Sequence, residues 1–427
     1  MAAREDLAVR QSPLFFVLIG IVFLSSCDRR EKPPAESRAD PPSEPIGLAD
    51  LNTLVTELPK LHKNLFFRLP EALWRTLATD VEHELPKMNR ARLAVMFATL
   101  VAAVGDGHTG LALEALSEFG RLPVQLRMFP DGLYVIGAGK DHAALRGKKL
   151  VRIGRHDVSM ARAMAKQVIS HDNAQSLSGR LAQVLVIPEV LHALGITDRP
   201  DHASVETSDG GVFQLPRVAS WREVDWFKPS ELVPRHRDKP SLAYWNDYLP
   251  GQKTLYFKYN RCADDPAAGM TFAKLVEGTL AFMKTKPVER FVLDLRDNGG
   301  GDSTIAGPLI AALAAHPTLN VRGRLFVLIG RHTFSSAVLN ALELKAKTQA
   351  LLVGEPTGGR PNHYGEVRHL TLPRTGWQIS YSTKYFTTDL VKGDPDSLVP
   401  DLPAPYPAAD WFAGHDPVLD AALNYKP

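Results

Sequence analysis

Apolar residues in the first part of the chain recur at the spacing of helices. Between residues 48 and 104 they return every three or four positions, as in Leu93 and Phe97. This period is typical of amphipathic helices that bury one face. The pattern predicts three short helices in an N-terminal helical domain over residues 48–110.

The middle of the chain, residues 111–250, is predicted to be a small β-rich insert. Its first residues, 111–113, have a strand pattern, and further strand-like runs alternate with helical stretches near 158–169 and 177–194. A turn sequence that begins at Asp209 stands between two strand-like runs. It predicts a hairpin.

From Leu255 onward, short apolar runs alternate with helical stretches. This alternation predicts an α/β layer with a largely parallel sheet, which we assign to residues 251–427. The fold class expected for the whole chain is α/β, or α+β overall when all three domains are counted. The strands predicted in the last domain are 255–259, 290–295, 324–330 and 350–355, and the helices are 271–284, 304–315 and 335–348.

Composition limits the classes of function that the chain can serve. Of its 427 residues, 44% are hydrophobic and 23% are charged, as in an ordinary globular protein with more than one domain. A net charge of +3, with no Lys/Arg-rich run in the body of the chain, gives no support for nucleic acid as a partner. The sequence has neither ligand-spaced His/Cys clusters nor a phosphate-binding loop, so we expect no metal and no other cofactor.

Residues 1–27 have the pattern of an export signal. An apolar run, 14–24, follows two arginines, is short for a membrane span, and leads into Ser-Ser-Cys27. This ending resembles a bacterial lipobox, which implies that Cys27 is lipidated and anchors the protein to a membrane of the bacterial cell envelope, facing the periplasm or the exterior. An uncleaved signal anchor is the alternative. Residues 28–47 are predicted to be a disordered tether, and Cys262, left without a partner, is expected to be buried.

Two stretches have features of nucleophilic chemistry. Three glycines, Gly299 to Gly301, follow a predicted strand, and such a loop leaves backbone N–H groups free to face an oxyanion. Ser335 and Ser336 stand where the next strand gives way to a helix, a position that suits a nucleophile. Taken singly, the glycines are also explained by a tight turn and the serines by a helix cap.

Several motifs occur in a fixed order in the second half of the chain. They are Asp294-Leu-Arg-Asp-Asn-Gly-Gly-Gly301, Thr333-Phe-Ser-Ser-Ala337, Leu352-Val-Gly-Glu-Pro-Thr-Gly358, Leu398-Val-Pro-Asp401 and His415-Asp-Pro-Val-Leu419. As a set they resemble the C-terminal processing (tail-specific) peptidases and the core domain of tricorn protease. The resemblance implies a serine-type peptidase core of ClpP/crotonase-like α/β fold that acts on polypeptides, preceded by an insert similar to a degenerate PDZ domain.

The resemblance assigns the nucleophile and the base. The family's spacing before Glu355 places the nucleophile at Ser335. The processing peptidases have a lysine base where this chain has Arg360, and an arginine stays protonated and does not accept a proton from serine. The tricorn-like branch uses a histidine from before the insert, and His108 matches it within Gly105-Asp-Gly-His-Thr-Gly110.

The other members of the site are also implied by the resemblance. The acidic member falls at Asp394, with Asp396 as its rival. The oxyanion hole is expected from the N–H of Ser336 together with that of Gly299 or Gly300.

Alternatives remain open at this level. His332 or His363 could replace His108 as the base, and Arg296 and Asp297 are expected to be a charge pair that closes the turn. A non-catalytic protein that binds a ligand or peptide on the same scaffold, or an esterase of small substrates, would also fit the fold.

Overall fold

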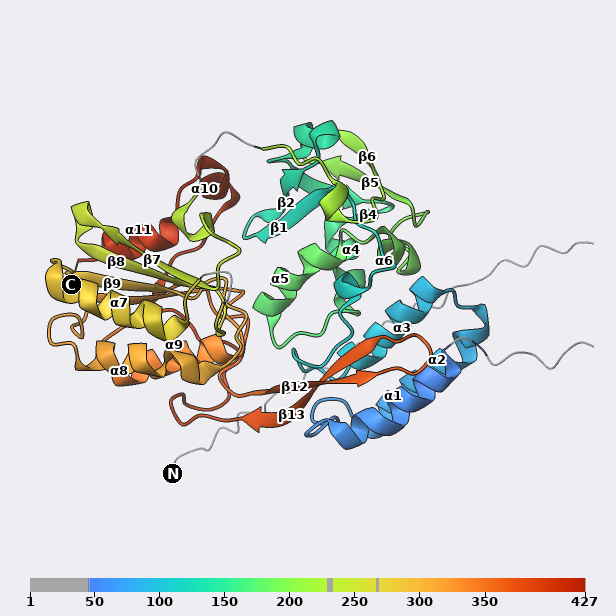
Figure 1. Ribbon diagram of the computed structural model, residues 1–427. Coiled ribbons are helices and arrows are strands. Elements are labelled where there is room, and N and C mark those ends of the chain that lie inside the picture. Colours follow the sequence, from blue (N-terminus) through green and yellow to red (C-terminus); the bar gives the residue numbers. More distant parts are fainter. Residues whose placement is uncertain (1–44, 46, 229–232, 266–268, 427) are drawn as a thin grey trace, which may run out of the picture. The chain divides into compact units, whose positions relative to one another are not determined.

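The computed structural model describes residue 45 and residues 47–228, 233–265 and 269–426 of the chain (Figure 1). The predicted signal peptide, Cys27 and nearly all of the predicted tether lie outside these residues. Within them, no helix is both long enough and apolar enough to cross a membrane.

Three helices form the N-terminal part of the described chain, as predicted. They are α1 (Leu48–Leu61), α2 (Glu71–Glu84) and α3 (Arg90–Ala102). α3 begins after Asn89, whose side chain accepts a hydrogen bond from the backbone N–H of Arg92 and so caps the helix. The apolar faces of the three helices join one hydrophobic core, which explains the helical spacing in the sequence.

A hairpin from the C-terminal part of the chain completes this core. β12 (His363–Thr371) pairs antiparallel with β13 (Gln378–Phe386), and buried residues of β13 share the core of the N-terminal helices. The backbone of Ser380 exchanges two hydrogen bonds of 3.0 Å with Gly110. The hairpin therefore ties the Gly105–Gly110 loop to a segment that the sequence assigned to residues 251–427.

An antiparallel sheet forms the insert, in the order β1-β2-β3-β5-β6, with β4 paired to β3. The hairpin predicted at Asp209 is confirmed between β5 and β6. The helix predicted near 177–194 is two helices, because Pro188 lacks the N–H that would continue α5 and instead begins α6. The strand predicted at 111–113 is wrong, since this segment enters a 3₁₀ helix. The elements are β1 (Val124–Phe129), β2 (Gly132–Ala138), β3 (Lys149–Ile153), β4 (His156–Asp157), α4 (Val158–Lys166), α5 (Ala174–Val184), α6 (Pro188–Ala193), β5 (His202–Thr207) and β6 (Val212–Pro216).

A second sheet of six strands is the scaffold of the C-terminal part, in the order β14-β11-β10-β9-β8-β7. All neighbours are parallel except β7, which pairs antiparallel with β8 at the edge. The prediction of a largely parallel sheet is confirmed, although the sheet starts at Tyr244, before the predicted domain start at residue 251. The strands are β7 (Tyr244–Leu249), β8 (Thr254–Tyr259), β9 (Arg290–Asp294), β10 (Leu325–Ile329), β11 (Leu351–Gly354) and β14 (Leu402–Pro403).

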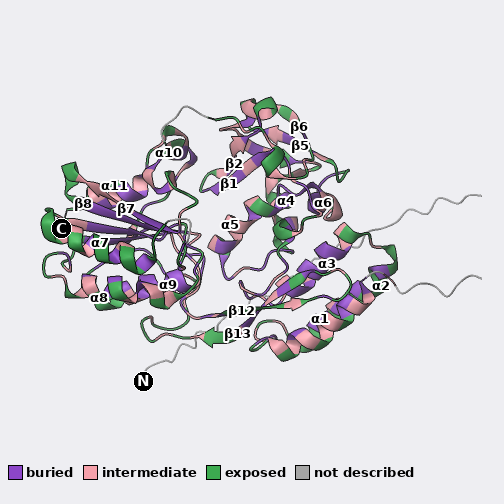
Figure 2. Ribbon diagram, in the orientation of Figure 1, coloured by how far each residue is buried: buried purple, intermediate pink, exposed green. Residues whose placement is uncertain are grey.

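Helices cover both faces of this sheet, so the inner strands β8, β10 and β11 are buried along their whole length (Figure 2). Along β9, Phe291 and Leu293 pack among α7, α8 and α9, whereas Val292 joins the cluster on the opposite face with α11. Burial on both faces explains the continuous apolar runs in the sequence. The helices are α7 (Phe272–Thr285), α8 (Gly307–Ala315), α9 (Ser336–Lys347), α10 (Ala408–Ala413) and α11 (Pro417–Leu423), and the 3₁₀ helices of the described chain include η1 (Leu85–Lys87), η2 (Leu113–Ala115), η3 (Lys140–Leu145), η4 (Trp221–Glu223), η5 (Arg235–Arg237), η6 (Pro250–Gln252) and η8 (Ser303–Ala306).

A buried ionic network fixes the end of β9. Arg296 is bound by the carboxylates of Asp294 (2.6 Å) and Asp416 (2.6 Å). The ammonium of Lys258, which is fully buried, contacts Asp297 at 2.8 Å and Asp294 at 3.2 Å. The predicted charge pair between Arg296 and Asp297 is therefore wrong. Arg296 pairs with Asp294 and Asp416, whereas Asp297 pairs with Lys258.

Replacing Arg296 with methionine is expected to lower the free energy of unfolding by about 3–5 kcal/mol, because it leaves the carboxylates of Asp294 and Asp416 buried without their cation. Urea denaturation followed by fluorescence measures this change. The matched control is Arg75→Met, which removes an exposed ion pair with Glu71 and should change the free energy by less than about 1 kcal/mol. Equal effects of the two substitutions would contradict a structural role of the network.

Candidate active site

Ser335 lies in a strained turn between β10 and α9. Its φ is +51°, one of three positive values among the described residues other than glycine. Such a conformation is unfavourable for a residue with a Cβ and is found where function needs a particular orientation. The Ser335 side chain does not cap α9, although it stands at the N-cap position. The helix-cap explanation therefore does not hold for Ser335, whose hydroxyl is left for other contacts.

The glycine run lies directly against this turn. A Cβ on Gly300 would stand 2.7 Å from the Cβ of Ser335 and 3.1 Å from the backbone N of Ser336, so only glycine fits there. The N–H of Gly300 donates to the side chain of Asn298 at 2.8 Å. By contrast, the N–H groups of Gly299 and Ser336 donate no hydrogen bond within the described part of the chain. Of the three predicted oxyanion donors, Gly299 and Ser336 are therefore the two left available.

Asn298 joins the two loops and was not identified from the sequence. It is fully buried, and its carbonyl accepts a 3.0 Å hydrogen bond from the N–H of Phe334 while its side-chain amide donates to the carbonyl of Tyr259. The side chain thus holds the glycine run, and its backbone holds the turn before Ser335. The signal that could have pointed to this role was an amide side chain directly before the glycine run of Asp294–Gly301.

His108 is brought to the same place from the loop after α3. Its ring packs against that of Phe334, the neighbour of Ser335, with centroids 4.5 Å apart, and stacks at 5.5 Å on His363. Neither ring nitrogen has a hydrogen-bond partner among the described residues. Burial lowers the pKa of His108 to about 4, although the charge of Asp106 opposes the change. The imidazole is therefore neutral near pH 7, as a general base must be.

The carboxylate nearest to His108 is Asp106, which sequence reasoning did not select. One of its oxygens lies 3.9 Å from Nδ1 of His108. The other accepts hydrogen bonds from Thr109 (2.5 Å), Ser382 (2.6 Å) and His62 (3.1 Å). Burial would raise the pKa of Asp106, but the hydrogen bond from His62 and the neighbouring groups hold it well below its usual range. Asp106 stands two residues before His108 in the sequence, and this spacing could have identified it.

Asp394, the acidic member expected from the resemblance, is engaged elsewhere. Its carboxylate binds Arg360 at 2.8 Å and lies 3.3 Å from the side-chain nitrogen of Asn362, and its side chain is 55% exposed. Asp396 also forms an ion pair with Arg360. Neither aspartate contacts His108 in the described structure. Arg360 is thus the centre of an ion-pair cluster, which agrees with the expectation that it is not a base.

The two alternative histidines lie on different sides of the site. His363 stacks on His108, and its Nδ1 is 2.9 Å from the carbonyl of Arg360. His332 packs against Gly179 of α5. Both pKa values are lowered by burial, that of His332 to about 4. His363 therefore contacts the predicted base rather than taking its place.

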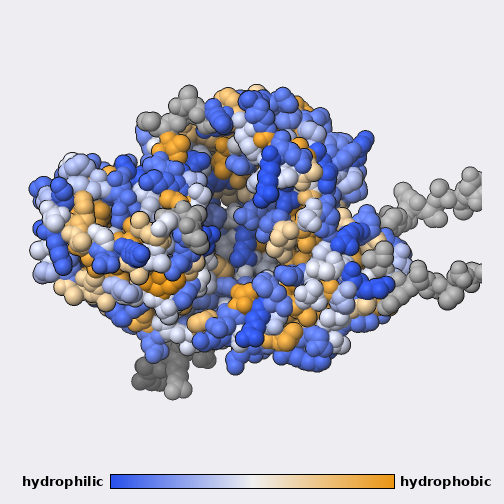
Figure 3. Space-filling view, viewed as in Figure 1, coloured by the Kyte–Doolittle hydropathy of each residue, from blue (hydrophilic) through white to orange (hydrophobic). Residues whose placement is uncertain are grey.

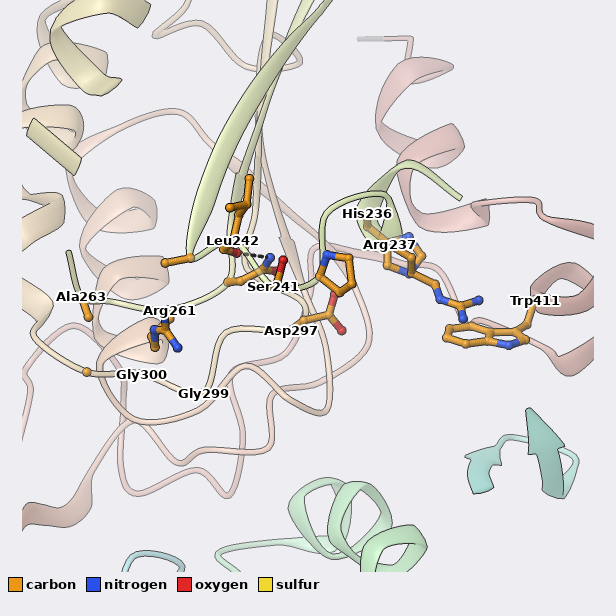
Figure 4. Close-up of a pocket in the computed structure, with 14 residues that line it drawn as sticks. His236, Arg237, Ser241, Leu242, Arg261, Ala263, Asp297, Gly299, Gly300 and Trp411 are labelled. Atoms are coloured by element: carbon orange, nitrogen blue, oxygen red, sulfur yellow. Dashed lines mark hydrogen bonds between the residues drawn. The ribbon is translucent and has the colours of Figure 1, made fainter. Parts of the chain in front are cut away.

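An open cleft of about 800 Å³ borders the glycine run (Figure 4). Gly299, Gly300 and Gly301 form part of its wall, and Arg237 and Trp411 lie across from them. The space-filling view shows a hollow near the middle of this face, with hydrophilic and hydrophobic residues around it (Figure 3). Ser335 is not part of the lining of the cleft, but it lies directly against Gly300, which is.

Comparisons with known proteins agree with this architecture. No family profile and no curated protein matches the chain. Among solved structures, mature CPAF matches with a TM-score of 0.59 and 14% identity over 89% of this chain and 98% of that one. The chain shares its fold with CPAF. The complex of mature CPAF with lactacystin gives a TM-score of 0.58 at 13% identity, over 89% and 99% of the two chains.

The likeness to CPAF confirms the predicted α/β fold class. The neighbours also include the photosystem II D1 C-terminal processing protease and the tricorn protease, with TM-scores of 0.41 and 0.42. Cys262 is free and buried, as the sequence predicted.

Proposed function

We propose that this protein is a serine peptidase that hydrolyses peptide bonds through an acyl-enzyme on Ser335. One observation carries the proposal: a strained serine without a capping bond, two unengaged N–H groups and a neutral imidazole meet at one edge of a parallel sheet. Acyl transfer needs these three components, a nucleophile, oxyanion donors and a base.

The steps follow from the positions of these groups. Ser335 Oγ attacks the peptide carbonyl as the His108 imidazole takes its proton, and the N–H groups of Gly299 and Ser336 stabilise the oxyanion. The imidazolium then protonates the departing amine, and water, activated by the same imidazole, releases the acid. Neither nitrogen of His108 is committed to another described residue, so the ring is available to Ser335.

Asp106 is proposed to orient His108, in place of Asp394. Asp106→Asn should lower kcat by roughly 10²- to 10⁴-fold with a much smaller change in KM, because a positioning carboxylate acts on the transition state. Asp106 raises the pKa of His108, so the acid limb of the kcat/KM profile should also move to lower pH. Steady-state kinetics across pH, with thermal unfolding to confirm a folded variant, make the test.

Asp394→Asn is the matched control. It changes a carboxylate that pairs with Arg360 and should keep most of the activity. If Asp394→Asn is the inactive variant and Asp106→Asn is active, the carboxylate expected from the resemblance is the correct one.

A binding protein on the same scaffold is the second candidate. It is favoured by one observation, that Ser335 and His108 form no hydrogen bond in the described structure. Esterase activity on small substrates would use the same groups. Exported polypeptides as substrates, lipidation of Cys27 and a place in the cell envelope stay predictions of the sequence.

A further inference from the structure

The cleft beside the glycine run contains an arginine without an anionic partner. Arg237 lines the cleft and is half-buried, and its side chain forms no hydrogen bond or ion pair with the described residues. Its guanidinium carbon lies 3.8 Å from the centre of the Trp411 ring, and that of Arg127 lies 4.2 Å from it. Burial lowers the pKa of Arg237, although Tyr406 and Asp297 oppose the change. A partly desolvated cation held on an aromatic ring is a strong site for a carboxylate.

A second arginine lines the cleft near the glycines (Figure 4). The side chain of Arg261 is 56% exposed, and a carboxylate oxygen of Asp265 lies 3.6 Å away. That oxygen already accepts the N–H of Ala243 at 2.7 Å. Arg261 therefore keeps most of its capacity to bind a further anion.

The acidic residue that lines the cleft does not cancel these charges. Asp297 is 37% exposed, but its carboxylate binds Lys258, whose ammonium is buried. His236, also in the wall, lies 3.1 Å from Asp416. The two arginines of the lining outnumber its one acidic residue, so the cleft carries a positive potential.

We propose that this cleft is a subsite for an acidic side chain of the substrate, close to the scissile bond. The inference rests on the proposed peptidase function, because Gly300 connects the cleft wall to Ser335. A substrate whose carbonyl reaches Ser335 places its adjoining residues in the cleft, between Arg237 and Arg261.

Matched peptides test the subsite. Short labelled peptides, otherwise neutral, carry one Glu or one Gln at each position in turn, and each is made with a free and with an amidated C-terminus. Binding to Ser335→Ala is measured by fluorescence anisotropy, and hydrolysis by the unmodified enzyme is measured in parallel. At one or two positions, the peptide with Glu should bind roughly tenfold more tightly than the peptide with Gln. Weaker binding on amidation, with no difference between the Glu and Gln peptides, would overturn the assignment to a side chain.

Variants of Arg237 and Arg261 test whether these two residues bind the carboxylate. In the Ser335→Ala background, Arg237→Gln and Arg261→Gln should each reduce the preference for the carboxylate, and Arg237→Lys should restore part of it. Arg322→Gln, an exposed arginine outside the cleft, should leave the preference unchanged. The preference should also weaken as salt is added.

The outcomes separate the two proposals. Hydrolysis of peptides without any preference between Glu and Gln overturns the subsite and leaves the peptidase function standing. Absence of both hydrolysis and covalent labelling of Ser335 overturns the peptidase function. The subsite is then still decided by anisotropy: charge-selective binding that depends on Arg237 supports it, and equal binding of all peptides overturns it.

Discussion

Replacing Ser335 with alanine is expected to lower peptide hydrolysis by at least about 10⁴-fold and to abolish labelling by a fluorophosphonate probe. The reason is local. Ser335 lies in a strained turn beside the glycine run, and its side chain does not cap α9. Backbone N–H groups at this place can donate hydrogen bonds to the oxyanion. Alanine removes the hydroxyl that attacks, whereas the donors and the cleft remain. Hydrolysis of a peptide library and labelling with the probe are the two measurements.

The neighbouring serine supplies the control. Ser336 contributes a backbone N–H, and its hydroxyl donates to the carbonyl of Gly301 at 2.5 Å. Ser336→Ala keeps that N–H and should still be labelled, while circular dichroism should show both variants folded. Labelling of Ser335→Ala would remove Ser335 as the nucleophile. If the unmodified protein is not labelled but binds peptides, the binding-protein alternative is favoured.

The elements around Ser335 could be predicted because their signals are local. The apolar runs of β9 and β10 predicted buried strands, which end at Asp294 and Ile329, a few residues before the glycine run and Ser335. Since neighbouring parallel strands end at one edge of a sheet, the order of the motifs also implied that the glycines and the serine meet.

The surroundings of His108 depend on contacts that no local pattern reports. Asp106 is held by Ser382, far along the chain, and by His62 from the end of α1. Nothing in the local sequence of β13 indicates that this strand packs on the N-terminal helices. The acidic residue was therefore sought near Asp394, by spacing from a motif, rather than beside the histidine.

Two residues of the proposed site adopt states that folded proteins normally avoid. A serine at positive φ and a buried histidine with both nitrogens unpartnered are each unfavourable for stability. Both lie within the proposed site, and the buried network around Arg296 supports the strand end from which the glycine run begins. Such conflicts are expected at functional positions in an otherwise consistent sequence.

His108→Ala is expected to reduce kcat by roughly 10⁴-fold or more, because it removes the imidazole that is proposed to take the proton from Ser335. The pH profile of the unmodified enzyme makes the assignment more specific. Burial lowers the pKa of His108 to about 4, and the base works only when neutral. The rate constant kcat/KM should therefore be constant near neutrality and fall as the pH drops through about 4, below the value near 6.5 of an ordinary histidine.

Two variants distinguish His108 from the other candidate bases. Arg360 binds the carboxylates of Asp394 and Asp396, so Arg360→Ala should retain a good part of the activity. His363 stacks on His108, and His363→Gln should weaken activity less than His108→Ala while keeping the acid limb. An inactive Arg360→Ala with an active His108→Ala would place the base at the family's lysine position. An acid limb near pH 6.5 would mean that the working imidazole is more solvated than His108 is in this structure.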